Sequence, residues 1–576
     1  NSLDNRGGNL ISNDQLTLTA PELKNQGGLI SGWKGVTVTG GTLDNSQEGS
    51  VSSLLGNLNI DLSGALINHS NGGLGGIGEV TIKATRLDNT SGTVTSGGKQ
   101  TLTITGGTIS NGAGGFIESG DTLDVRAATL SNAGGRITAS KALTFTGTQL
   151  DNSGGSLVGK GSVTLDLLGA LTNVNGALGS TGPLVIKRSA SVDNRGGQLI
   201  SQSLLDLLTH GDLNNSAGGT ISANGQLDLK ADGTLHNNGD GLISSRDAAV
   251  NLTAAALNNG KGAVQSFTAL TVNTGIGAID NQGGKLIAQT GDLNITAASL
   301  DSRGGVLSSL KGLLQTRLTG VLRNGQGGKI EGSRLDLRAL GGIYSDGGRI
   351  AANTGDILLD AGANALDNSA GGIYAKGQVK VSAGSMNNNA GQVSGSVIDL
   401  GAGTGLSNRG GLIESASTLA VRATNLDNQS GKLRALGTSG KTDFQIGSLF
   451  DNRNGLVETA NTHFTLAAPS FLNAGGSVAH VGVGEFDIST ANVMNAGGLL
   501  VTRGGLTLNA DSWTNSSVIQ AGRLTLNINN FTQTASGQVL ASNQLTGRGV
   551  NWYNDGLIAS DGGMDIQLGG SYGGNG

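Results

Sequence analysis

The stretch Leu3-Asp4-Asn5-Arg6-Gly7-Gly8 introduces a phrase that returns from one end of this 576-residue chain to the other. Close copies stand at residues 23–28, 192–197 and 406–411. With the Asn taken as the anchor, 27 copies lie between Asn5 and Asn554, and the 549 residues between these two anchors divide into 26 intervals of about 21 residues. A repeat this short and regular predicts a solenoid in which each repeat forms one coil.

Each repeat also carries a pattern of short strands. The residue two positions before the anchor is apolar in all 27 copies, the anchor is Asn in 24, and Gly stands three positions after it in 21. Apolar and polar residues alternate at residues 16–19, 36–39 and 123–125, which indicates strands with one buried face. No stretch keeps a helical period. We therefore predict an all-β fold, a right-handed parallel β-helix of about 27 coils of about 21 residues.

The composition agrees with closely stacked turns, since 102 residues are Gly and only 3 are Pro. Gly supplies turns with positive φ, whereas Pro would remove donors from a parallel ladder. Asn tolerates the left-handed region, and its amide can bond to its copy one coil away. We interpret the anchors as a structural ladder, represented by Asn5, Asn25, Asn45, Asn89, Asn152, Asn194, Asn215, Asn281, Asn368, Asn408 and Asn428.

Charge and cysteine content restrict the environment of the chain. The formal net charge is −5 with 13% charged residues, so no nucleic-acid partner is expected. The absence of Cys suits a chain that crosses an oxidising compartment unfolded. The chain begins inside a repeat and stops just after one, so we expect a fragment. In solution we expect a monomeric rod roughly 130 Å long, from coils about 4.8 Å apart.

The unit that begins at Leu150-Asp151-Asn152, and those at Leu87-Asp88-Asn89 and Leu366-Asp367-Asn368, resemble the filamentous-haemagglutinin repeat of two-partner secreted exoproteins. The resemblance covers essentially the whole chain. Among members of this family, the chain most resembles the stalk of contact-dependent growth inhibition toxins. It implies a secreted, extracellular β-helical filament on the surface of a Gram-negative bacterium. It also implies an outer-membrane partner transporter for export and a target-cell receptor, either protein or glycan, at the distal end or in an adjoining region.

The pattern changes near residue 450. Ten of the 16 aromatic residues follow residue 443, and the apolar slot of the last six repeats reads Phe450, Phe471, Val493, Trp513, Phe531 and Trp552. We therefore expect a regular rod at residues 1–442 and an aromatic-rich distal transition or capping region at 443–576. Either the large residues fill the core or the region forms a receptor-binding tip.

Among the aromatic residues outside the apolar slot, five are expected to be exposed: Trp33, Tyr344, Tyr374, Tyr553 and Tyr572. Trp33, Tyr553 and Tyr572 are the candidate recognition residues.

A search for chemistry predicts no catalytic residue, no cofactor and no metal site. Asp280 and Asp301 occupy the same slot in successive repeats and could hold a cation, but ten of the 27 copies carry Asp there, which favours a turn residue. The five His residues show no ligand spacing. Residues 303–349 are rich in Arg and Lys, with no interleaved aromatics, and are interpreted as a solvated basic band.

These observations favour a rigid, non-catalytic extracellular stalk of a surface toxin or adhesin, which projects a receptor-binding and toxin-delivery region toward a target cell. One alternative is a β-helical carbohydrate-active enzyme, a polysaccharide lyase or hydrolase, which would need Asp, Lys or Arg clustered on one face. Another is a glycan- or receptor-binding adhesin whose site lies in the last coils.

Overall fold

The computed structural model describes residues 2–493 and 496–576. Within them the chain forms 66 strands, and the strand pairs are parallel, with partners about one repeat apart. The described residues contain no helix that is long and apolar enough to cross a membrane. The predicted all-β, right-handed parallel β-helix of about 27 coils is confirmed. The anchor Asn495 lies outside the described residues.

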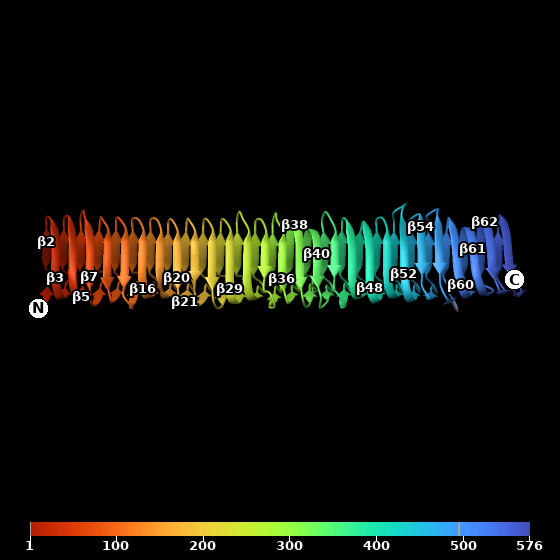
Figure 1. Ribbon diagram of the computed structural model, residues 1–576, viewed down its shortest axis with the longest axis horizontal. Coiled ribbons are helices and arrows are strands. Elements are labelled where there is room, and N and C mark those ends of the chain that lie inside the picture. Colours follow the sequence, from red (N-terminus) through yellow and green to blue (C-terminus); the bar gives the residue numbers. More distant parts are fainter. Residues whose placement is uncertain (1, 494–495) are drawn as a thin grey trace. The chain divides into compact units, whose positions relative to one another are not determined.

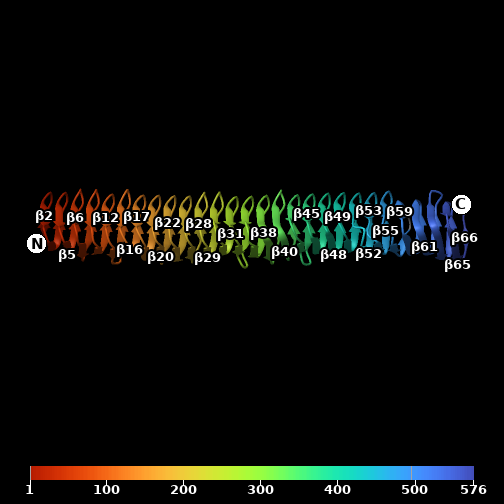
Figure 2. The same cartoon turned by 90° about the horizontal axis from the view of Figure 1, so that it is seen from above.

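The chain divides into two compact units, an N-terminal unit that ends at Gly291 and a C-terminal unit, Asp292–Gly576. Both are built in the same way. Within each unit, successive coils lie side by side and their strands pair with those of the coil before and the coil after (Figures 1 and 2).

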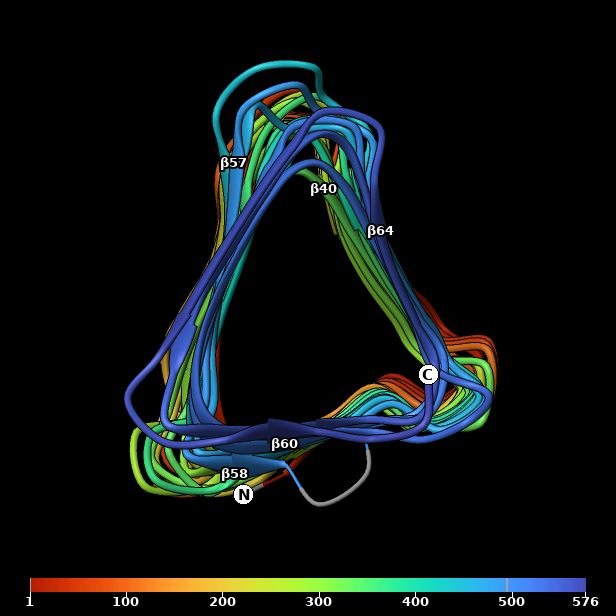
Figure 3. The same ribbon diagram turned by 90° about the vertical axis from the view of Figure 1, so that its right-hand side faces the viewer.

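One coil has three faces, which give it the triangular outline of Figure 3. In a typical coil, face 1 is β24 (Ser191–Asp193), which ends just before the anchor Asn194. Face 2 is β25 (Gln198–Ser201) and face 3 is β26 (Leu205–Thr209). The next coil then begins with β27 (Leu213–Asn214). In the described coils the anchor therefore lies at the corner between face 1 and face 2.

The core consists of columns of apolar side chains, one column for each inward position. Leu199 in β25 is buried and pairs with Leu178 of β22 (Ala177–Ser180) and with Ile221 of β28 (Thr220–Ala223). Alternation along each strand places such residues inward and polar residues outward. Each fully buried Leu or Ile stabilises the fold by about 1.5–3 kcal/mol, and only stacked neighbours bury it.

Coils that are shorter or longer than 21 residues differ in the turns at their corners, while the strands of the three faces are retained. Between Asn515 and Gln533 the anchors are only 18 residues apart. There β61 (Val518–Gln533) runs through all three faces without a separate turn. Between Asn428 and Asn452 the spacing is 24 residues, and the extra residues lie in the loop between β51 (Lys432–Ala435) and β52 (Lys441–Asp451).

The glycines after the anchor have two separate roles. The position two after the anchor adopts positive φ, as in Gly196 (+62°), but Ala217 and Ser430 adopt it as well. The Gly three after the anchor is needed for space, since a Cβ on Gly197 would lie 2.0 Å from the carbonyl oxygen of Asn173 in the preceding coil. We expected the glycines to supply positive φ, but at this second position Gly is needed because neighbouring coils approach closely.

Candidate functional site

The anchor amides of the N-terminal unit form one continuous chain of hydrogen bonds. From Asn5 to Asn281, the Nδ2 of each anchor donates to the Oδ1 of the next anchor over 2.6–2.8 Å. The expected ladder residues of this unit lie in that chain: Asn5, Asn25, Asn45, Asn89, Asn152, Asn194, Asn215 and Asn281.

Asn215 shows what one rung contributes. Its side chain is fully buried, and its Oδ1 accepts from Asn194. Its Nδ2 donates to Asn237 Oδ1 at 2.8 Å, to the Gly219 carbonyl at 3.0 Å and to the Leu242 carbonyl at 3.1 Å. The side chain therefore joins three coils and satisfies backbone acceptors at the corner, where an unpaired buried carbonyl would be costly.

In the C-terminal unit the ladder is interrupted at Ser345. Asn324 Nδ2 donates to Ser345 Oγ at 3.1 Å, but no hydrogen bond runs from the shorter Ser345 side chain to Asn368. The buried Oδ1 of Asn368 consequently has no hydrogen-bond partner among the described residues. From Asn368 the ladder resumes through Asn388, Asn408, Asn428 and Asn452 to Asn473, each bond 2.7 Å long.

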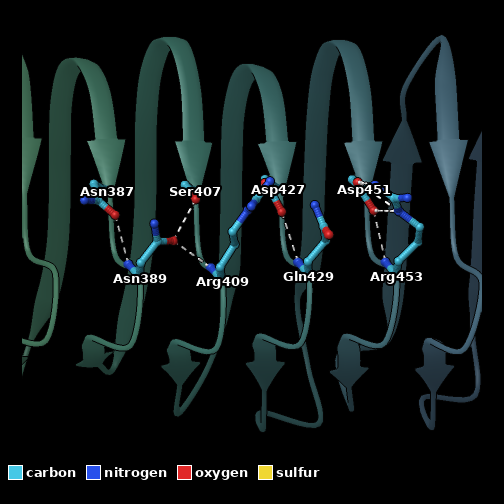
Figure 4. Close-up of polar contacts among 8 residues, drawn as sticks. All are labelled: Asn387, Asn389, Ser407, Arg409, Asp427, Gln429, Asp451 and Arg453. Atoms are coloured by element: carbon cyan, nitrogen blue, oxygen red, sulfur yellow. Dashed lines mark hydrogen bonds and ion pairs between the residues drawn. The ribbon is translucent and has the colours of Figure 1, made fainter.

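A second, outward row of polar side chains follows the ladder corner (Figure 4). The residue before the anchor closes a turn: Asp427 Oδ1 accepts from the Gln429 backbone N–H, and Asp451 Oδ1 from that of Arg453. Neighbouring coils are also joined, since Arg409 Nε donates to Asp427. Asp280 and Asp301 each close such a turn, toward Gln282 and Arg303, as their turn-residue interpretation requires.

Charge pairs strengthen some of these turns. The hydrogen bond from Arg195 holds the pKa of Asp193 below its usual range, although partial burial acts in the opposite direction. The same arrangement between Arg6 and Asp4 lowers the pKa of Asp4 to about 2. Both pairs are solvent-exposed, so they add little to stability.

Family comparison identifies this repeat architecture. The haemagglutinin repeat matches residues 1–70, 54–113, 95–175, 159–217, 208–266, 396–443, 465–530 and 519–572, which together make up more than half of the chain. The chain belongs to the haemagglutinin repeat family. It is a secreted, cell-surface-associated bacterial β-helical protein of this type.

Two curated relatives share the repeat region. The chain is 27% identical over 532 residues to the deoxyribonuclease CdiA of Dickeya dadantii (strain 3937), which is 84% of this chain and 14% of that protein. It is 28% identical over 258 residues to the tRNA nuclease CdiA-2 of Burkholderia pseudomallei (strain 1026b), 40% of this chain and 8% of that protein. The chain thus spans a small part of the length of these relatives. No solved structure matches it.

Eight of the ten aromatic residues after residue 443 lie in the core. All six residues of the changed apolar slot are buried: Phe450, Phe471, Val493, Trp513, Phe531 and Trp552. Phe464 stacks on Phe486 with ring centroids 4.4 Å apart, and Phe450 on Phe471 at 5.4 Å. In these positions the side chains fill the core and are not accessible to a receptor.

A buried histidine accompanies this aromatic core. His480, in β56 (Ser477–His480), bonds through Nδ1 to Thr502 Oγ1 at 2.8 Å and through Nε2 to the Asn461 carbonyl at 2.9 Å. Burial lowers its pKa. Asn461 in turn donates to the carbonyls of Ser417, Gly437 and Ser439, so this polar cluster holds the loop between β51 and β52 in place. No sequence signal singled it out, because its members lie in separate repeats.

The three candidate recognition residues have different surroundings. Trp33 is 48% exposed, in the turn between β4 (Leu29–Gly32) and β5 (Gly35–Asp44), and Tyr553 is 46% exposed on β63 (Asn551–Asn554). Tyr572, 55% exposed, pairs with Trp552 in the inward slot of the last described coil. Its placement outside that slot is therefore wrong, and its exposure follows from having no described coil beyond it. Its hydroxyl accepts from Asn554.

Most cations of the basic band are exposed, as its interpretation as a solvated face requires, but several are paired. Within it, Arg317 is paired with Asp336, and Arg349 with Glu331. The expectation that no aromatics interleave is wrong, because the Arg323 guanidinium lies 5.3 Å from the ring centre of Tyr344. Tyr344 and Tyr374, which were expected to be exposed, are half-buried for this reason.

The described residues hold no group of three or more His, Asp or Glu side chains that could bind a metal ion.

Proposed function

We propose that this chain is the rigid extracellular stalk of a secreted surface toxin or adhesin, which holds a receptor-binding and toxin-delivery region away from the producing cell. The observation that supports this proposal is the amide ladder, which is unbroken from Asn5 to Asn281 and runs again from Asn368 to Asn473. Within each unit a parallel backbone ladder, a buried apolar column and a chain of side-chain amides all connect the same coils. A body joined by three such systems resists bending, as a spacer must.

Family membership supports the remainder of the proposal. An outer-membrane partner transporter exports the unfolded chain, and the folded product stays attached to the surface of a Gram-negative cell. Both relatives are named as nucleases, which favours a toxin stalk over a pure adhesin. Their matched regions are the repeats, so we place any toxin activity outside this chain. We expect the target-cell receptor to contact the distal end or an adjoining region.

The test uses the secreted protein that carries this chain on its own bacterium. Deletion of residues 5–214 removes ten whole coils and restores the register at Asn215. A spacer should shorten by about 48 Å, at about 4.8 Å per coil, and still act on target cells. Electron cryotomography measures the length of the surface filament, and co-culture measures inhibition of, or adhesion to, target cells. Loss of action by a protein that is still displayed would contradict the stalk.

A further inference from the structure

A shallow hollow on face 2 of the C-terminal unit has the chemistry of a sugar-binding platform. It has a volume of about 260 Å³ and includes Arg349, Tyr374 and Gln392 among its lining residues. These side chains come from three successive coils, on β42 (Arg349–Ala352), β45 (Gly372–Ala375) and β47 (Gln392–Gly395). The other lining residues are Gly and Ala, so only backbone and small side chains surround the three larger side chains.

The Tyr374 ring lies across the strand because Gly372 leaves room for it. Arg349, Gly372 and Gln392 are register partners in adjacent strands. A Cβ on Gly372 would lie 2.3 Å from the Tyr374 ring, so any other residue there would displace it. The ring is therefore held along the surface, between an arginine on one side and an amide on the other.

Both neighbours hold the ring and keep free donors. The Arg349 guanidinium carbon lies 4.9 Å from the ring centre, and Tyr374 Oη donates to Gln392 Oε1 at 2.9 Å. Arg349 Nε donates to Glu331, but its terminal nitrogens have no partner within residues 2–493 and 496–576. The Gln392 amide nitrogen likewise has none in the described chain. An oriented ring, a guanidinium and an amide thus face one small hollow.

These groups select an acidic sugar. The face of a sugar ring is apolar and can pack on an aromatic ring, while arginine recognises carboxylates through two parallel hydrogen bonds. The Gln392 amide suits hydroxyl groups. Lys329, the register partner of Arg349 in β40 (Lys329–Ala339), is exposed and adds a second cation one coil away. We propose that this hollow binds a uronic-acid-containing glycan, with the carboxylate on Arg349 and the sugar ring on Tyr374.

The experiment titrates the purified chain with oligogalacturonate and, separately, with a neutral oligoglucan of the same length, by isothermal calorimetry. We expect the acidic oligomer to bind and the neutral one not to bind. Tyr374→Ala and Arg349→Gln should each weaken binding roughly tenfold. Glu331→Gln should strengthen it, because it removes the carboxylate that competes for Arg349.

Tyr344→Ala is the matched control, because Tyr344 also lies beside an arginine, Arg323, in the same unit. It should leave binding unchanged, and circular dichroism melts should show that all variants remain folded. Equal binding of the neutral oligomer, no binding of the acidic oligomer at millimolar concentration, or equal losses in Tyr344→Ala and Tyr374→Ala would each overturn the proposal.

Discussion

Replacement of Asn215 by Asp tests the amide ladder with a change of almost no volume. The new carboxylate would keep the acceptor for Asn194 but lose all three donated bonds, to Asn237, Gly219 and Leu242. The Nδ2 group has two hydrogen atoms to share among these three acceptors, so at about 1 kcal/mol of net stability for each hydrogen the loss is about 2 kcal/mol. The carboxylate would also face three oxygen atoms, which adds to the cost.

The penalty should depend on pH with a definite sign. Burial among oxygens raises the pKa of the introduced carboxyl in the folded state above its unfolded value of about 3.9. Below about pH 4 the group is protonated in both states and can donate one bond again, so the loss falls to about 1 kcal/mol. Stability is then lost progressively as the pH rises through the raised folded pKa.

Asn214→Asp is the control, because it makes the same chemical change one residue away. Asn214 Oδ1 accepts from Ser216, as Asp151 accepts from Ser153 in another coil, so Asp is expected to replace it with little effect. Native-state hydrogen exchange at the backbone amide of residue 215, which donates to His236, measures the local opening free energy. Equal losses in the two variants would refute the ladder argument.

Four further outcomes are expected. Ser345→Asn should supply the missing donor to Asn368 Oδ1 and stabilise the C-terminal unit by about 1–3 kcal/mol, measured by urea unfolding; destabilisation would show that the corner cannot accept the larger side chain. Because the folded pKa of His480 is lowered, its contribution is present above the unfolded value of about 6.5 and is lost as the pH falls below it. His480→Asn should therefore reduce the loss of stability between pH 7.5 and 5, measured by urea unfolding, and an unchanged loss would contradict this. Deletion of residues 194–214, one period, should leave the fold intact by circular dichroism, whereas deletion of half a period should unfold neighbouring coils. Tyr553→Ala should weaken binding of the chain to target cells if the last coils carry the receptor site, and unchanged binding would direct attention to face 2.

The sequence predicted the coil and its corner well, because both depend on a pattern that every repeat shares. The apolar residue two positions before the anchor must face inward. Because nearly every repeat has Asn at the anchor, each anchor side chain must lie beside the equivalent Asn of the next coil. Contacts between residues that differ from one coil to the next could not be predicted from the repeat pattern. The spacing of Tyr374 does not show that its ring lies over Gly372, nor that Arg349 lies beside it. The His480 cluster likewise forms from residues of three repeats that are not part of the repeating motif.

The uniform corner has a consequence for how genes of this kind change. Since nearly every anchor donates to the next in the same way, the surfaces on the two sides of a coil match those of most other coils. Unequal recombination between two repeats in the DNA, at equivalent codons, therefore yields a shorter or longer chain whose corners still meet. Such an event duplicates or deletes whole repeats. Residues that differ between coils, such as Ser345, Tyr374 and His480, are duplicated or deleted together with the repeat that contains them. Length and local chemistry can thus be inherited independently, each in steps of one coil.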